Sequence, residues 1–84
     1  SKMQLAGYGK DNQLKLRFQP KASITEINKV LNAVNASITE GPDADNFYII
    51  SIKINNKKSS EKIVSGIISQ LEQKTKLIEY VDKP

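Results

Sequence analysis

The segment that most constrains the fold is the run at residues 47–54, which reads FYIISIKI. Its even-numbered positions are all apolar, whereas its odd-numbered positions hold Phe, Ile, Ser and Lys. Because successive side chains of a strand point to opposite faces, this alternation predicts a strand with one fully buried face. Aromatic and β-branched residues, which favour strands, make up most of the run. We therefore expect a central strand of a sheet.

Two helices are predicted from apolar residues at helical spacing. The first spans about residues 24–35 and follows a capping-box sequence, Ser23 with Glu26 three residues later. The second follows Ser59 or Ser60, and Gly66 within it indicates a close approach to the sheet. The two apolar stripes are Ile24, Ile27, Val30, Leu31 and Val34, and Ile63, Val64, Ile67, Ile68 and Leu71. Both stripes require an apolar surface to pack on.

Three more strands are predicted around these helices. They lie at residues 14–19, at residues 36–40 before Gly41-Pro42, and at residues 77–81. The resulting order is βαββαβ. This order consists of two βαβ halves. With right-handed crossovers, the two halves predict an α+β, ferredoxin-like sandwich, in which a four-stranded antiparallel sheet carries both helices on one face. The other face is then expected to be open.

The domain organisation follows from the composition of the first residues. Residues 1–13 combine glycine and polar residues without periodicity, which is typical of a flexible leader or linker. Residues 14–84 are expected to form the ferredoxin-like domain. A chain of 84 residues provides one hydrophobic core and no second one.

The composition argues against an enzyme and against a metal or cofactor site. The chain has no Cys and no His, which removes zinc ligands, a thiol nucleophile and an imidazole base. Its glutamates do not pair at any spacing that predicts an acid–base dyad, and Asp43 and Asp45 fit turn chemistry better than a calcium loop. No stretch reaches the ~18 apolar residues of a membrane span. Membrane attachment is therefore expected only through a segment outside this chain.

The surfaces expected to bind a partner are the open sheet face and the last strand. The open face combines cations with two apolar residues, a mixture found in docking surfaces and also on solvated sheets. The strand at 77–81 is expected at a sheet edge, where a partner can add a strand, with Leu77 and Val81 on the face opposite Ile78 and Tyr80. The predicted contact residues for a protein or peptide partner are Lys15, Arg17, Phe47, Ile49, Lys53, Leu77, Glu79 and Val81.

RNA binding is the alternative from a different class. RNA-recognition domains share this topology and stack bases on the open face, here through Lys15, Arg17, Phe47 and Lys53. However, the third strand lacks their aromatic motif, and only one of the thirteen basic residues is Arg. The net charge of +4 is mild. These features argue against a nucleic-acid partner.

Residues 14–84 resemble a small ferredoxin-like domain found in two kinds of bacterial protein. One is the extracytoplasmic domain of membrane-bound, anti-sigma-factor-like regulators, and the other is the propeptide of subtilisin-like proteases. The resemblance rests on a few structural positions. They are Phe18-x-Pro20, Ser23-x-x-Glu26, Gly41-Pro42 after the second strand, Tyr48 and Val81.

The resemblance implies a non-catalytic interaction or sensing module on the periplasmic side of a membrane. Gly41-Pro42 fits the regulator group better, although no zinc-binding domain or membrane span is present here to support it. As a propeptide, an intramolecular chaperone and inhibitor, the chain would lay residues 80–84 along a protease cleft. The regulator domain is the first expectation and the propeptide is the alternative.

Overall fold

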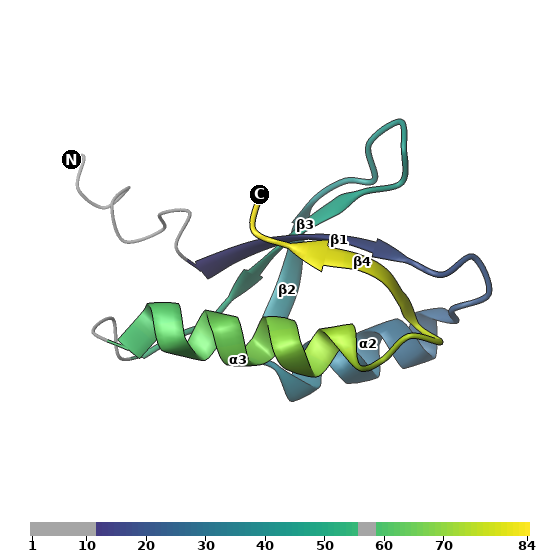
Figure 1. Ribbon diagram of the computed structural model, residues 1–84. Coiled ribbons are helices and arrows are strands. Elements are labelled where there is room, and N and C mark those ends of the chain that lie inside the picture. Colours follow the sequence, from purple (N-terminus) through teal and green to yellow (C-terminus); the bar gives the residue numbers. More distant parts are fainter. Residues whose placement is uncertain (1–11, 56–58) are drawn as a thin grey trace.

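The computed structural model describes residues 12–55 and 59–84. Residues 1–11 of the predicted leader, which spans residues 1–13, lie outside the described part. Gln13, which the sequence pattern assigns to the leader, starts the first strand, and the Asn12 side chain contacts the sheet, because its Nδ2 donates to the carbonyl of Ile52 at 2.8 Å. The elements are β1 (Gln13–Phe18), α2 (Ile24–Ala33), β2 (Ala36–Glu40), β3 (Tyr48–Ile52), α3 (Ser60–Glu72) and β4 (Ile78–Asp82) (Figure 1).

The four strands form one sheet in the order β2-β3-β1-β4. All neighbouring strands pair antiparallel. Both helices lie on the same side of the sheet, and the β2–β3 loop rises on the other side (Figure 1). The predicted α+β, ferredoxin-like arrangement is thus confirmed, with β2 and β4 at the edges. We call the sheet surface away from the helices the open face.

The core lies between the sheet and the two helices. The alternation at residues 47–54 is confirmed at its centre, because Ile50 and Ile52 are buried, whereas Tyr48 and Ile54 on the same face are only half-buried. The predicted stripe of α2 begins one turn too early, since Ile24 is 73% exposed and the first residue to pack on the core is Ile27. The buried apolar residues are Leu14, Leu16, Val30, Leu31, Val34, Ala36, Ile50, Ile52, Val64, Ile67, Leu71, Ile78 and Val81.

Of the predictions made for the two helices, the cap of α2 is confirmed and the role of Gly66 in α3 is not. The capping box at Ser23 is formed, because its Oγ accepts from the Glu26 N–H at 3.1 Å and the Glu26 carboxylate accepts from the Ser23 N–H. Ser59 stands at the N-cap of α3 but makes no side-chain cap hydrogen bond. The predicted close approach at Gly66 is wrong. A Cβ there would meet nothing within 4 Å, because Gly66 faces outward from α3.

Each edge strand contains a bulge. In β4, Arg17 pairs with Tyr80 but the next residue, Phe18, pairs with Ile78, so Glu79 is an extra residue on the edge. In β2, the pairing to β3 shifts in the same way between Ile38 and Glu40. Bulges twist an edge away from a regular ladder, which discourages a further strand from pairing with it. We therefore expect a partner strand to pair less readily with these two edges than with a regular edge strand.

Candidate functional site

The centre of the open face is a cluster of two aromatic rings and two cations. The Lys15 Nζ lies 4.5 Å from the centroid of the Phe47 ring, and the Arg17 Cζ lies 4.7 Å from it. The Tyr80 ring meets the Phe47 ring nearly at a right angle, with 5.3 Å between centroids. These distances are those of cation–π and edge-to-face contacts. We call Lys15, Arg17, Phe47 and Tyr80 the aromatic–cation cluster.

Three strands bring the cluster together. Lys15 lies across from Ile49 on β3 and from Asp82 on β4. Arg17 lies across from Tyr80 on β4. Phe47 directly precedes β3, next to the Leu16–Tyr48 pair, which places it beside Arg17. The cluster therefore depends on the register of β1 with both of its neighbours.

Arg17 is also held by acidic and carbonyl oxygens. Its Nε donates to Glu79 Oε1 at 3.1 Å, and its Nη1 donates to the Asp45 carbonyl at 3.4 Å. The β4 bulge places the Glu79 carboxylate within reach of the Arg17 guanidinium. An ion pair between two partly exposed side chains contributes only about 0–1 kcal/mol to stability, so its main effect is to orient the guanidinium.

The β2–β3 loop positions Phe47 through Asp43. Asp43 Oδ1 accepts from the N–H groups of Asp45 and Phe47, both at 2.9 Å. The Asp43 N–H donates to the Phe47 carbonyl at 3.0 Å, which closes the loop. The turn interpretation of Asp43 is thus confirmed. The Phe47 N–H, followed by the Asp45 N–H and the charges of Lys15 and Arg17, lowers the pKa of Asp43, while partial desolvation opposes them.

This loop geometry predicts a titration at acidic pH. Because the pKa of Asp43 is lower in the folded chain than in the unfolded chain, its stabilising effect is present above the unfolded value and is lost as the pH falls through the folded value. We expect an NMR titration of the Phe47 amide to give a midpoint below the ordinary aspartate pKa of about 3.9. Asp43→Asn keeps an acceptor oxygen and should abolish the transition. A midpoint at or above the ordinary value would contradict the loop geometry.

A shallow depression of about 270 Å³ opens between the cluster and the β2–β3 loop. Its apolar part is provided by Phe47 and Ile49, and its charged part by Glu40, Asp43 and Lys15. Glu40 lies across from Ile49 because of the β2 bulge. The lining residues are Lys15, Glu40, Gly41, Asp43, Phe47, Tyr48, Ile49 and Pro84.

The structure brings together five of the eight predicted contact residues. They are Lys15, Arg17, Phe47, Ile49 and Glu79. Lys53 does not join them. It follows the end of β3, six residues from Phe47. At about 3.3 Å per residue, that is roughly 20 Å along the strand direction.

Leu77 and Val81 do not belong to an exposed binding surface. Leu77 precedes β4 and packs against the core, while its carbonyl accepts from the Gln19 N–H at 2.9 Å. Ile78 and Val81 are both buried, at 6% and 9% exposure, so the predicted placement of Leu77 and Val81 opposite Ile78 and Tyr80 is wrong. The physical reason is the extra residue Glu79, which resets the alternation of side chains.

Two residues of the site were missed from the sequence. Tyr80 is 42% exposed beside Phe47, and the only signal for it was an aromatic residue in an edge strand. Asp43 was assigned to a turn, but not to the positioning of an open-face ring. An Asp whose carboxylate accepts from the N–H two residues later is a known turn motif, so the spacing from Asp43 to Asp45 was the available signal.

No helix in residues 12–55 and 59–84 is long and apolar enough to cross a membrane. The same residues contain no group of three or more carboxylates that could hold a metal ion. The sequence matches no protein-family model, and neither a curated protein nor a solved structure matches it.

Proposed function

We propose that this chain is a non-catalytic protein-interaction module whose open face is the docking surface. The observation that carries this proposal is the aromatic–cation cluster. It gathers two partly exposed aromatic rings, a Lys and an Arg at the centre of a sheet face that neither helix covers. Aromatic residues and Arg are the side chains most enriched at the energetic centres of protein interfaces.

A protein partner suits this surface better than a nucleic acid. Sequence-tolerant binding of single strands depends on aromatic faces that are available for base stacking. Lys15 and Arg17 already lie over the Phe47 ring, and Tyr80 meets it edge-on. Arg17 is in addition paired with Glu79. A phosphate backbone would have to displace these internal contacts.

The biological setting of the proposal comes from the resemblance described above. We place the module on the extracytoplasmic side of a bacterial membrane, in a membrane-anchored regulator of the anti-sigma-factor type. The full-length gene that encodes this sequence tests the proposed extracytoplasmic location. A membrane span encoded upstream supports it, whereas a signal peptide upstream with a Ser/His/Asp protease domain downstream would replace it with the propeptide role.

Site-specific photo-crosslinking tests the docking surface. With benzoylphenylalanine in place of Tyr80, we expect crosslinks to a second protein in the cells that make this protein naturally. The Phe47→Ala change should remove these crosslinks. The matched control is the same probe at Ile63 on α3, which is 37% exposed against 42% for Tyr80. Crosslinks from position 63 alone, or crosslinks to RNA from position 80, would contradict the proposal.

A further inference from the structure

The open face is acidic, although the whole chain has a net charge of +4. The described residues include eight carboxylates, of which five lie on the open face or on the loop beside it. Of the nine described cations, Lys15 and Arg17 lie among these carboxylates. The five carboxylates are Glu40, Asp43, Asp45, Glu79 and Asp82.

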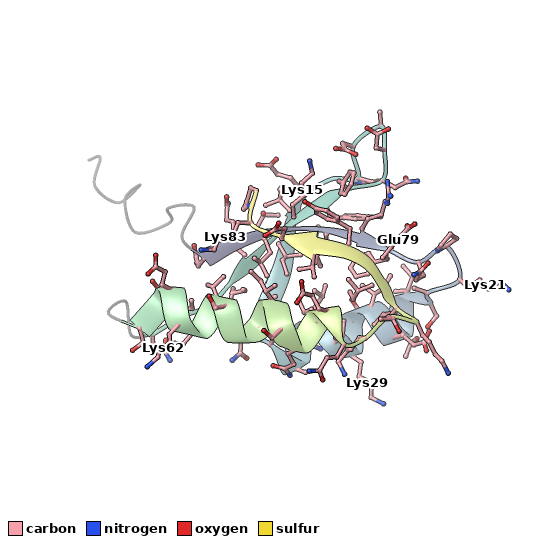
Figure 2. The ribbon with its side chains drawn as sticks, in the orientation of Figure 1. Lys15, Lys21, Lys29, Lys62, Glu79 and Lys83 are labelled. Atoms are coloured by element: carbon pink, nitrogen blue, oxygen red, sulfur yellow. The ribbon has the colours of Figure 1, made fainter. Side chains whose placement is uncertain are left out.

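The remaining cations lie on the helices, in the turns and beyond the strand ends. Figure 2 shows Lys29 and Lys62 pointing from the helices away from the sheet, whereas Lys15 lies on the opposite side. The full set is Lys21, Lys29, Lys53, Lys62, Lys74, Lys76 and Lys83. Outside the open face and its loop, the described residues hold these seven cations and three carboxylates, so acids outnumber bases only on the open-face side.

The acids of the open face are only partly neutralised within the described residues. The one salt bridge in this part of the chain joins Arg17 to Glu79. The carboxylates of Glu40, Asp43 and Asp82 have no cationic atom within 4.0 Å there. Asp43 keeps its charge at neutral pH, since its pKa lies below the ordinary value. This surface is therefore complementary to a positively charged partner.

The depression beside the cluster suggests how such a partner fits. Two carboxylates, Glu40 and Asp43, and one cation, Lys15, line it together with the partly buried side chains of Phe47 and Ile49, so its charged lining is acidic on balance. A Lys or Arg side chain can place its charged end near the two carboxylates while its methylene groups pack on the apolar residues. In an extended segment, residues two positions apart lie on the same side, so a neighbouring apolar side chain can reach the Phe47–Tyr80 pair.

Building on the proposed docking function, we infer that the open face binds an extended basic protein segment. In this segment a Lys or Arg and an apolar residue stand two positions apart. The cation occupies the depression between Glu40 and Asp43, and the apolar side chain packs on the Phe47–Tyr80 pair. The charge of the surface, rather than that of the whole chain, selects the partner.

The test is an NMR titration of the ¹⁵N-labelled chain with two matched peptides, TKTLTKTLTK and TETLTETLTE. The Lys peptide is expected to shift the amides of residues 40–49 and 80–82 and to bind more weakly as salt is raised. Glu40→Gln should weaken its binding by about 2- to 5-fold, because an exposed charge pair contributes up to about 1 kcal/mol. The control Glu72→Gln, an exposed carboxylate on α3, should leave the affinity unchanged.

Each result of this titration has a defined meaning. Tighter binding of the Glu peptide at residues 40–49 would overturn the inferred charge preference and leave the docking surface itself intact. Shifts confined to the helices, or no shifts from the Lys peptide at millimolar concentration, would overturn the inference. Single-stranded oligouridine that shifts the same open-face amides more strongly than the Lys peptide would overturn the inference and the proposed function together.

Discussion

Replacing Ile50 with Ala is expected to lower the free energy of unfolding by about 3 kcal/mol. Ile50 is fully buried in β3, between Leu14 of β1 and Ile38 of β2. Truncating a buried Ile removes its transfer free energy and leaves a cavity, with a usual cost of about 2–5 kcal/mol. A domain of this size is stabilised by only about 5–10 kcal/mol, so the loss is a large part of the total. Urea denaturation followed by circular dichroism measures it.

The neighbouring residue provides the matched control. Ile49 is in the same strand but on the open face, where it is partly buried across from Lys15. Because its side chain is not enclosed by the helices, Ile49→Ala should cost less than about 1 kcal/mol. Equal losses at the two positions would mean that the open face is also a packed core face, which would contradict the one-sided arrangement of the helices.

The sheet faces and the topology could be predicted because they depend on local and general rules. The alternation at residues 47–54 identified the buried face of β3, since a strand has a side-chain period of two. The order of the elements then left few arrangements, because consecutive elements pack close together and crossovers are right-handed. The observed strand order β2-β3-β1-β4 agrees with these rules and has the last strand at an edge, as predicted.

The faces of β4 could not be predicted in the same way. Alternation within residues 77–81 is a local pattern, whereas the bulge at Glu79 exists only in relation to the pairing of β4 with β1. One extra residue moved Val81 into the core and left Tyr80 on the open face. The same limit applies to α2, where helical spacing identified the stripe but not the point at which Ile24 passes beyond the core.

The candidate site shows a similar division between local and long-range features. Lys15, Arg17 and Phe47 were predicted on the open face from alternation alone, and the structure places them in contact. The acidic surroundings were not predicted, because they come from residues 40–45 and 79–82, which are far apart in the sequence. A net charge of +4 for the whole chain concealed this local excess of carboxylates.

Replacing Gly41 with Ala is expected to destabilise the domain by about 2 kcal/mol or more. Gly41 has a φ of +108°, a conformation that side chains rarely adopt and that costs about 1–3 kcal/mol for other residues. A Cβ there would also lie 2.7 Å from the Phe47 carbonyl oxygen and 2.9 Å from the Tyr48 Cα. Because both atoms are backbone, the loop must shift. The shift should disturb the hydrogen bond from Asp43 to Phe47, and therefore the position of the Phe47 ring.

Gly66→Ala is the control and should have the opposite sign. Gly66 is exposed inside α3, and a Cβ there would meet nothing within 4 Å. Since Ala favours a helix interior over Gly by about 1 kcal/mol, this change should stabilise the domain. Urea denaturation gives both free energies, and the amide shifts of Phe47 and Tyr80 should move in the Gly41 variant alone. A Gly41→Ala protein as stable as the parent, with unchanged shifts, would show that the β2–β3 loop does not require this glycine to hold Phe47 on the open face.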